Sequence, residues 1–410
     1  MMRRLGVDTV SVARLELAVA RSGRRFLDKA FTAAELAYCD GRAERLAGRW
    51  AAKEAVIKCF HGTTISFPRR KIEVLPGEGG APQVRLLGYS KGAQIEISIT
   101  HAGGIAVATA LLEVSDQWAP LLPVPSAVSL PVRPVDAHKG SFGTVVALAG
   151  SLGLTGAAYL CATAAARAGA GMVRLLVAQS IYPVLAVKCT EVMATPVAEV
   201  APGAVGHSAL DHILRVVNAS SAAVIGPGLG RDTSTWRLVV DLVSHAQVPL
   251  VLDADALNAM ADHRRILSRL GPGRVLTPHP GEMARLVRRS ISEVGLDRRQ
   301  AAAQAAAEWG AVVVLKGART IIAAPDGRIC EDPHQVPALA SGGTGDVLAG
   351  IIAGLLAQGS DPFTAAASGV YIHAAVGRRI TAIQGDSGLL ASDLLPLIPG
   401  AMATLREGGL

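Results

Sequence analysis

The stretch Ser341-Gly342-Gly343-Thr344-Gly345-Asp346-Val347-Leu348 decides the fold of the larger part of this 410-residue chain. Apolar residues follow at helical spacing, at positions Leu348, Ile351, Ile352 and Leu355. This spacing predicts a buried helix over 347–357 that begins at the glycine loop. Backbone N–H groups at such a helix start form an anion site. Asp346 falls in the first turn, where an aspartate either caps the helix or places a base beside the anion.

Strands and helices alternate through the part of the chain that surrounds this stretch. Short apolar runs predict strands over 144–149, 172–177, 222–225, 250–252, 275–277 and 312–315. An alanine-rich run predicts a helix over 156–168. Near-continuous apolar strands that alternate with helices indicate an α/β fold with a mostly parallel sheet covered on both faces.

Four further loops fall at the carboxyl ends of these strands, where ligands bind in such sheets. They are Gly226-Pro-Gly228-Leu-Gly230, Asp253-Ala-Asp255-Ala-Leu-Asn258, Thr277-Pro-His279-Pro-Gly-Glu282 and Leu315-Lys316-Gly-Ala. Together with the first stretch, they gather glycines, carboxylates, a histidine and a lysine at one edge of the sheet. Phosphoryl transfer needs positioned phosphates, charge neutralisation and a base on the acceptor hydroxyl. The set therefore predicts a ribokinase-like fold that acts with a nucleotide.

The ordered set of motifs is more specific than the fold. With His138-Lys139-Gly140 and Thr155-Gly156-Ala157 upstream, it resembles the ADP-dependent NAD(P)H-hydrate dehydratase family over residues 136 to about 400. The resemblance implies repair of NADH and NADPH whose nicotinamide ring has gained water. Phosphorylation turns the ring hydroxyl into a better leaving group, and phosphate then departs. ADP is the implied donor, with ATP as the alternative, and ADP yields AMP.

The resemblance also implies roles for individual residues. Asp346 matches the base and substrate contact, and Gly345 matches a nucleotide contact. The other implied nucleotide contacts are Lys316, Gly317, Ala318, Arg319 and Thr320. The implied contacts to the hydrated dinucleotide are Ala157, Gly228 and His279. The chain has Val336-Pro337-Ala338 where the family often has Asn-Pro-Gly, so a lid or substrate contact is expected to differ there.

Residues 1–114 show a different pattern. Leu5-Gly-Val-Asp8-Thr-Val predicts a strand, and residues 95–109 predict a hairpin with His101 to Gly104 at its turn. Helical spacing of Leu46, Trp50, Ile57 and Phe60 places Lys53, Glu54 and Lys58 on a helix.

Three charged residues of this part suggest a metal site. Glu54 and Lys58 are four apart, a spacing that most often gives a surface ion pair. Asp8 in an apolar strand needs a partner or a metal. Two carboxylates and a lysine suit Mg²⁺ bridging a pyrophosphate, whereas His101 alone predicts only a turn histidine.

The order Gly6-Val-Asp8, Phe31-Thr32-Ala-Ala-Glu35, Arg49-Trp-Ala-Ala-Lys53-Glu54-Ala and Ser98-Ile-Thr-His101 resembles holo-[acyl-carrier-protein] synthase. That small phosphopantetheinyl transferase family has an α+β fold. The resemblance implies transfer of 4′-phosphopantetheine from coenzyme A to a serine of apo acyl carrier protein.

Within this family resemblance, Asp8 and Glu54 would bind Mg²⁺, Lys58 would contact phosphate, and Glu54 and Lys58 are the implied catalytic residues. Sites between subunits of a trimer are common in the family, so a homo-oligomer is expected. Gly62-Thr63-Thr64 departs from the family's usual Gly-Thr-Gly, which affects the expected coenzyme A contacts.

A proline-rich stretch separates the two parts. Residues 115–135 hold five prolines, which resist helix and sheet interiors. We therefore predict a semi-extended linker here, between a synthase-like domain over 1–114 and a dehydratase-like domain over 136–410.

Composition limits the partners and the compartment. The net charge of +7 is spread along the chain, which favours small nucleotides over nucleic acid; the short run Arg69-Arg70-Lys71 is expected to begin a strand. Five cysteines without C-x-x-C spacing predict buried thiols in a reducing cytoplasm. Asp8 interrupts any signal-peptide core, and no apolar run of 18 residues predicts a membrane span.

Other functions remain open from the sequence. The larger domain could be a vitamin-precursor kinase of the same fold, or a catalytically silent nucleotide-binding module that regulates the synthase. The smaller domain could be a trimerisation module without activity. The intact Asp346 in one domain and the intact Asp8, Glu54 and Lys58 in the other favour two enzymes on one chain.

Overall fold

The computed structural model describes residues 2–60, 68–87, 93–114 and 124–407. The chain divides into two compact units, of which the first ends at Pro123 and the second begins at Val124. The departure at Gly62-Thr63-Thr64 and the part of the predicted linker over 115–123 lie outside the described residues.

The first unit has an α+β fold, as predicted. Its three-stranded antiparallel sheet has the order β1-β5-β4, and β2 pairs with β3 in a separate hairpin. The strands are β1 (Met2–Ser11), β2 (Ile72–Pro76), β3 (Pro82–Leu86), β4 (Ala93–Ala102) and β5 (Ile105–Val114). The helices are α1 (Val12–Ala30), α2 (Ala33–Cys39) and α3 (Ala43–Cys59).

Helix α3 packs directly against β1 because Gly6 has no side chain. A Cβ atom on Gly6 would lie 1.9 Å from the backbone oxygen of Ala55. This close approach brings Asp8, two residues further along β1, beside the polar face of α3.

Two local predictions for this unit are corrected by the structure. His101 lies within β4, opposite Ala106, and not in the turn of the β4–β5 hairpin. Arg69-Arg70-Lys71 does not begin a strand but forms a 3₁₀ turn, and β2 starts only at Ile72. The physical reason is that Lys53 Nζ binds the backbone oxygens of both Arg69 (2.9 Å) and Ile72 (2.6 Å), which holds this segment in a bend.

The second unit is built on a nine-stranded sheet with the order β16-β15-β14-β13-β12-β11-β6-β7-β8. Neighbours from β14 to β8 run parallel, and β15 and β16 add an antiparallel edge. The parallel strands are β6 (Thr144–Leu148), β7 (Met172–Ala178), β8 (Met193–Val197), β11 (Ala222–Ile225), β12 (Leu250–Leu252), β13 (Arg274–Leu276) and β14 (Val312–Leu315). The antiparallel edge is β15 (Ile321–Ala323) and β16 (Ile329–Glu331), and a small separate pair is β9 (Glu199–Ala201) and β10 (Ala204–Val205).

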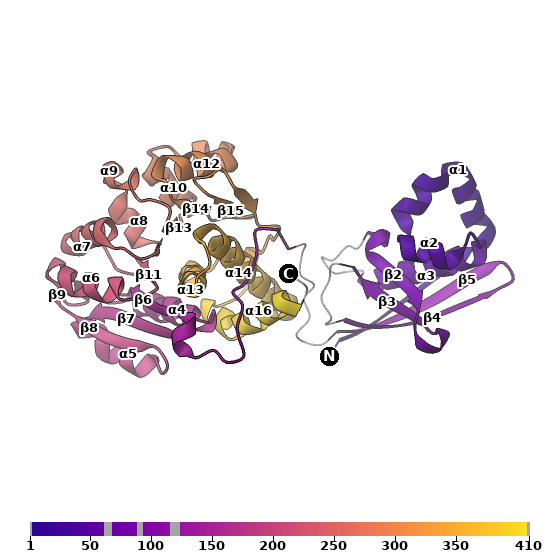
Figure 1. Cartoon of the computed structure of the whole chain (residues 1–410), viewed down its shortest axis with the longest axis horizontal. Coiled ribbons are helices and arrows are strands. Elements are labelled where there is room, and N and C mark those ends of the chain that lie inside the picture. The colour runs from indigo at the N-terminus through magenta and orange to yellow at the C-terminus, as the bar shows by residue number, and fades with distance from the viewer. Residues whose placement is uncertain (1, 61–67, 88–92, 115–123, 408–410) are drawn as a thin grey trace. The chain divides into compact units, whose positions relative to one another are not determined.

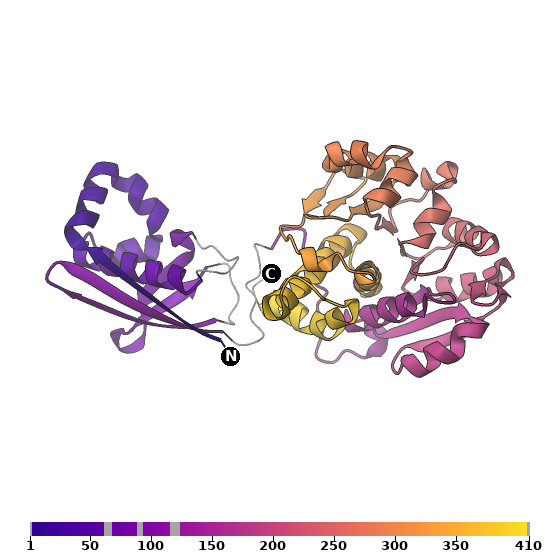
Figure 2. The same ribbon diagram turned by 180° about the vertical axis from the view of Figure 1, so that it is seen from behind.

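Helices cover both faces of this sheet, as Figures 1 and 2 show. On one face lie α4 (Thr155–Arg167), α13 (Thr344–Ala357) and α14 (Pro362–Gln384). The opposite face carries α6 (Leu210–Asn218), α7 (Thr233–His245), α8 (Asp255–Met260), α10 (Pro280–Val287) and α12 (Arg298–Trp309). The remaining helices are α5 (Tyr182–Lys188), α9 (Arg264–Leu267), α11 (Ile291–Leu296), α15 (Ala391–Leu394) and α16 (Ile398–Glu407). The predicted α/β architecture with a covered, mostly parallel sheet is thus confirmed.

The described end of the proline-rich stretch packs against the second unit. Ser129 N donates to Ser368 Oγ, and this hydroxyl donates back to Ser129 O at 2.8 Å. Val128 and Leu130 are buried on either side. The segment from Val124 onward is therefore anchored on α14.

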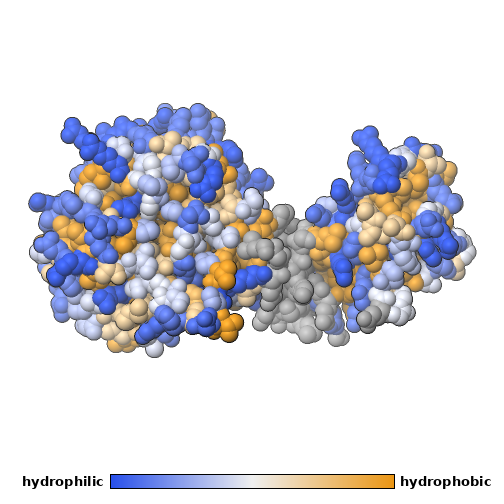
Figure 3. Space-filling view, in the orientation of Figure 1, coloured by the Kyte–Doolittle hydropathy of each residue, from blue (hydrophilic) through white to orange (hydrophobic). Residues whose placement is uncertain are grey.

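The surface of each unit is mixed. On the face shown in Figure 3, hydrophilic and hydrophobic residues are interspersed over both units.

In the parts of the chain that the structure describes, no helix combines the length and the apolar character needed to span a bilayer. Of the five cysteines, four are buried, as predicted, and Cys189 is partly exposed.

Glycines allow α13 to lie close to α4, and this contact provides a test of the packing. A Cβ on Gly350 would lie 2.1 Å from the backbone oxygen of Cys161. We expect Gly350→Ala to lower the free energy of unfolding of the second unit by ~1–3 kcal/mol, because the helices must separate. Chemical denaturation measures this change. Gly295→Ala in α11 is the matched control, since a Cβ there meets nothing within 4 Å; an equal loss in both variants would contradict the packing argument.

Candidate active site

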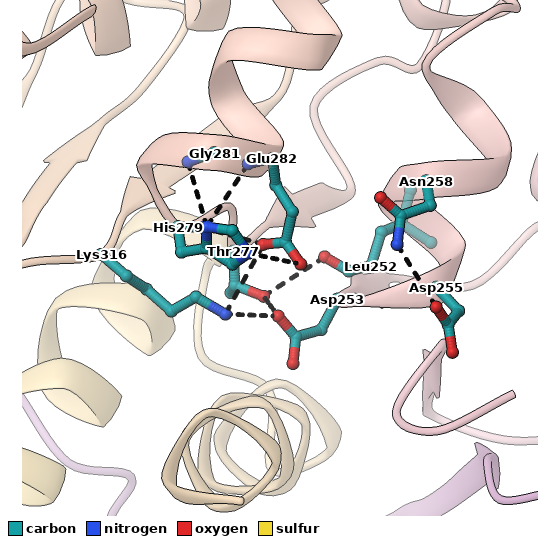
Figure 4. A network of polar contacts seen from close by, with 9 residues as sticks. All are labelled: Leu252, Asp253, Asp255, Asn258, Thr277, His279, Gly281, Glu282 and Lys316. Carbon is teal, nitrogen blue, oxygen red and sulfur yellow. Dashed lines mark hydrogen bonds and ion pairs between the residues drawn. The ribbon is translucent and has the colours of Figure 1, made fainter. Parts of the chain in front are cut away.

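The candidate site of the second unit is formed where β12, β13 and β14 end. Asp253 follows β12, Thr277 follows β13 and Lys316 follows β14. Lys316 Nζ lies 2.8 Å from Asp253 Oδ1, and Thr277 Oγ1 donates to the same oxygen at 2.7 Å. Figure 4 shows these side chains pointing toward one another. Burial alone would lower the pKa of Lys316, but Asp253 and neighbouring carboxylates outweigh it, so the pKa is raised and the lysine stays charged.

His279 and Glu282 form the start of α10 beside this lysine. Glu282 Oε2 accepts from His279 N at 2.8 Å, and His279 Nδ1 accepts from Gly281 N at 3.0 Å, which is a reciprocal cap. Glu282 Oε2 also lies 3.9 Å from Lys316 Nζ. Burial raises the pKa of Glu282 to about 7, whereas burial and the charge of Lys316 lower that of His279. A neutral imidazole with an exposed edge therefore faces solvent at the site.

The glycine loop before α13 lies against Lys316. Gly343 is the N-cap residue with φ +90°, and a Cβ on Gly345 would lie 3.3 Å from Lys316 Nζ. Asp346 lies in the first turn of α13, three residues after the N-cap residue Gly343, which has no side chain to cap the helix. Burial, reinforced by Asp253 and opposed by Lys316, raises the pKa of Asp346 to about 7. The carboxyl is thus poised to exchange a proton near neutral pH.

The loop after β11 brings together two predicted dinucleotide contacts. Gly228 has φ +63°, and a Cβ on it would lie 2.8 Å from the Cβ of Ala157 at the start of α4. Gly226 is equally constrained, since its Cβ would lie 1.9 Å from the backbone oxygen of Asp253. Gly230 N donates to Asp255 Oδ2 at 2.8 Å, which ties this loop to the one after β12.

The predicted nucleotide loop from Lys316 to Thr320 is held by Arg298 of α12. This arginine donates to the backbone oxygens of Leu315 (3.1 Å) and Ala318 (2.8 Å). Gly317 and Arg319 have φ values of +152° and +55°. The loop borders a cavity of about 430 Å³ that also reaches Gly345. The predicted lysine, glycines and alanine of the nucleotide site thus lie around one hollow.

The sequence did not single out several residues that build this site. Asp253, Thr277 and Glu282 belong to the predicted motifs without a role of their own, and none of the motifs contains Arg298. A signal existed for Asp253, because an aspartate that directly follows a buried strand at a carboxyl end faces the ligand edge. No sequence signal marks Arg298, whose contacts are to backbone atoms of a loop 17 to 20 residues away.

In the first unit, the candidate metal ligands are each paired with a cation. Lys58 Nζ lies 2.9 Å from Asp8 Oδ1 and donates to Val7 O at 2.7 Å. Glu54 pairs with Arg69, whose guanidinium lies 4.7 Å from the ring centroid of Trp50. Glu54 and Lys58 are neighbours on α3, but each pairs with a residue outside the helix.

A buried ion pair that the sequence did not reveal fixes the surroundings of Glu54. Lys53 and Glu35 are both fully buried, with Lys53 Nζ 2.7 Å from Glu35 Oε2. Glu35 Oε1 accepts from Val74 N at 2.8 Å. Burial lowers the pKa of Lys53, opposed by Glu35. Lys53 Nζ also donates to the backbone oxygen of Arg69. The buried ion pair therefore fixes the position of Arg69, the partner of Glu54.

The remaining predicted residue, His101, lies exposed on β4. Within the described ranges, no group of three or more histidine, cysteine, aspartate or glutamate side chains is arranged to hold a metal. A metal at Asp8 and Glu54 would therefore need oxygen ligands from its substrate or from water.

Comparison with known proteins identifies the larger unit. A family model described as NAD(P)H-hydrate dehydratase matches residues 145–399. The chain belongs to this family. The bifunctional NAD(P)H-hydrate repair enzyme of Moorella thermoacetica is 47% identical over 278 residues, which are 68% of this chain and 52% of that protein. The ADP-dependent (S)-NAD(P)H-hydrate dehydratase of Xanthomonas campestris is 38% identical over 69% of this chain and 97% of its own length.

A solved structure and a second family model complete the comparison. The ADP/ATP-dependent NAD(P)H-hydrate dehydratase of Bacillus subtilis, crystallised with ATP and Mg²⁺, is 33% identical with a TM-score of 0.58 and covers 67% of this chain and 94% of its own. A model of the 4′-phosphopantetheinyl transferase superfamily matches residues 4–110. The chain spans about half the length of several bifunctional relatives it matches, as the 52% for the Moorella protein shows.

The raised pKa of Asp346 predicts a pH-dependent stability. Its folded-state pKa is about 7, above the ~3.9 of an unfolded aspartate. Between these two pH values, the folded state holds a proton that the unfolded state has lost. The free energy of unfolding therefore falls as the pH rises from about 4 to about 7. Asp346→Asn removes this penalty, so we expect its free energy of unfolding at pH 8 to exceed that of the wild type by about 4 kcal/mol, with the advantage absent at pH 4.

Denaturant unfolding at several pH values measures this difference. Asp326→Asn is the matched control, because Asp326 lies on an exposed turn and pairs with Arg328. An identical pH slope in the wild type and in Asp346→Asn would show that Asp346 is ionised in the folded state throughout this range.

Proposed function

We propose that the second unit dehydrates hydrated NADH and NADPH with ADP as phosphoryl donor, and ATP as the alternative. The observation that carries the proposal is the position of Asp346, a carboxyl of raised pKa in the turn that also places Gly345 against Lys316. Asp346 as the base, Lys316 as the cation and the backbone N–H groups at the start of α13 then lie next to one another. Two relatives of this chain are named as dehydratases of this type.

The residues suit each step of that reaction. Asp346 accepts the proton of the ring hydroxyl as the oxygen attacks the terminal phosphorus of ADP, and AMP leaves. Lys316 and the N–H groups at the start of α13 stabilise the charge that spreads over the transferring phosphoryl group. Phosphate then departs from the ring with the loss of a neighbouring proton, which restores the nicotinamide double bond.

The geometry also places the second substrate. Ala157 and Gly228 lie close together, since a Cβ on Gly228 would be 2.8 Å from the Cβ of Ala157, and we assign the hydrated dinucleotide to this surface. His279 presents its ring beside Lys316 at the same edge. A vitamin-precursor kinase would need the anion site and Asp346 but not this additional surface, so the dehydratase is favoured over that alternative. The silent module is disfavoured because Asp346 retains its raised pKa.

Replacement of Asp346 tests the base role. Asp346→Asn keeps the size of the side chain but cannot accept a proton, so we expect turnover of hydrated NADH to fall by roughly 10²–10⁴. ADP binding should persist. Absorbance of the restored NADH measures turnover, and Asp326→Asn serves as control. Near-normal turnover by folded Asp346→Asn would exclude the base role.

We infer that the first unit transfers 4′-phosphopantetheine from coenzyme A to a serine of an apo acyl carrier protein. Asp8 and Glu54 offer the hard oxygen ligands that Mg²⁺ prefers, and each carboxylate pairs with a half-exposed cation. Bound Mg²⁺ would neutralise the pyrophosphate and ease departure of 3′,5′-ADP. Lys58 would then turn from Asp8 to a phosphate oxygen. A homo-oligomer remains a prediction.

Removal of either carboxylate tests this assignment against the inactive trimerisation module. We expect Asp8→Ala and Glu54→Ala to lose most carrier-protein loading and to leave dehydration of hydrated NADH unchanged, because separate sites act independently. Mass spectrometry of the carrier protein measures loading. Asp28→Ala is the control, since Asp28 lies exposed on α1 and pairs with Arg24. Wild-type loading by both variants would refute the metal site.

A further inference from the structure

A second cavity of the larger unit lies at the other end of the parallel strands. Its volume is about 400 Å³, and it is lined by Thr144, Met172 and Met193, the first residues of β6, β7 and β8. The candidate active site lies where β12, β13 and β14 end. Because all these strands run parallel in one sheet, their starts and their ends lie at opposite edges. The second cavity is therefore separate from the proposed nucleotide and dinucleotide sites.

The floor of this cavity is a piece of the sheet with an arginine among apolar side chains. Arg174 of β7 lies between Val146 of β6 and Met193 of β8, its partners in the strand register. Met172 lies two residues before Arg174 and so shares its face of the sheet. Val146 is buried, whereas Arg174 and Met193 are exposed. A guanidinium group thus stands on an apolar floor and remains open to solvent.

Helix α6 forms a wall of the cavity and adds further donors. His212 and Arg215 of this helix line the cavity, are exposed and lie three residues apart, which places them on one face of the helix. Arg215 Nε donates to the backbone oxygen of Asp211 at 3.2 Å. Within the described part of the chain, the side chains of Arg174 and His212 have no hydrogen-bond or ion-pair partner. None of the described residues that line the cavity is acidic, so its donors face no counter-charge.

We propose that this cavity binds a small organic anion in which a carboxylate or phosphate group carries an apolar chain. Guanidinium groups bind both kinds of anion through paired N–H donors. The apolar floor suits a chain of methylene groups, and the flexible methionine side chains can adapt to its shape. A volume of about 400 Å³ lies within the range of small-molecule sites.

The affinity should depend on both parts of such a ligand. Arg174 and Arg215 offer charge and donors, whereas Val146, Met172 and Met193 offer only apolar surface. An anion without a chain would leave this floor exposed to water, and a chain without an anion would leave the guanidinium groups unpaired. A purely electrostatic surface would not distinguish an anion with a chain from one without it.

Binding of four simple probes to the full chain tests the proposal. Octanoate and octyl phosphate carry both parts, acetate lacks the chain, and 1-octanol lacks the charge. We expect the first two to bind saturably in an NMR titration, and acetate and 1-octanol to bind at least roughly 10-fold more weakly. The tighter of the two octyl anions identifies whether the site prefers a carboxylate or a phosphate.

Substitutions in the cavity locate the bound probe. We expect Arg174→Gln and Arg215→Gln each to weaken octanoate binding by roughly 10-fold, because each removes a charged donor. Met193→Asp places a carboxylate beside Arg174 and should weaken it as well. Arg299→Gln is the matched control, since Arg299 is exposed on α12 and does not line the cavity.

The outcomes separate this inference from the proposed function. Saturating ADP should leave octanoate binding unchanged, and displacement of octanoate by ADP would overturn the inference. Unchanged octanoate affinity in both folded arginine variants, or 1-octanol binding as tightly as octanoate, would overturn it too. Failure of the chain to bind ADP would contradict only the proposed donor site. Thermal unfolding establishes that each variant is folded, and Met193→Asp provides the test if the arginine variants are not.

Discussion

The ion pair between Lys316 and Asp253 is the interaction on which the larger site depends. Its 2.8 Å contact ties the end of β14 to the end of β12, and the bond from Thr277 to the same carboxylate adds β13. Three parallel strands are thus held in register at their ligand edge. Removal of either charge would leave the other buried and uncompensated, which costs about 3–5 kcal/mol in comparable pairs. The close approach of Gly345 to this lysine then fixes where α13 begins.

This one ammonium group cannot balance all the carboxylates around it. Asp253 lies closest to the lysine, with its Oδ1 at 2.8 Å from Nζ. Glu282, at 3.9 Å, and Asp346 are therefore stabilised less by this positive charge. Burial then raises the pKa of both carboxyls to about 7. The excess of acidic groups therefore has a chemical consequence, because it keeps Asp346 able to take up a proton at neutral pH.

Uniformly apolar segments were predictable from the sequence, whereas mixed and charged segments were not. The runs at Leu250–Leu252 and Val312–Leu315 became β12 and β14, because strands buried on both faces are uniformly apolar. The outer strands β8, β15 and β16 were missed. β8 contains Thr195 and Pro196, and β15 and β16 pair antiparallel, outside the alternation of parallel strands and helices. Lys53 could not be recognised as buried, because a lysine on a helix is normally solvated and only Glu35, 18 residues earlier, explains it.

The two units use ion pairs in opposite ways, and this difference bears on how each site works. Lys316 is largely buried, with 19% of its side chain exposed, and Arg298 holds its loop through backbone oxygens. Such a pair is preorganised and needs no rearrangement when phosphate arrives. Lys58 and Arg69 are 42% and 41% exposed, and exposed pairs of long side chains contribute little stability. The ion pairs of Asp8 and Glu54 can therefore be broken at small cost, which the proposed Mg²⁺ site would require.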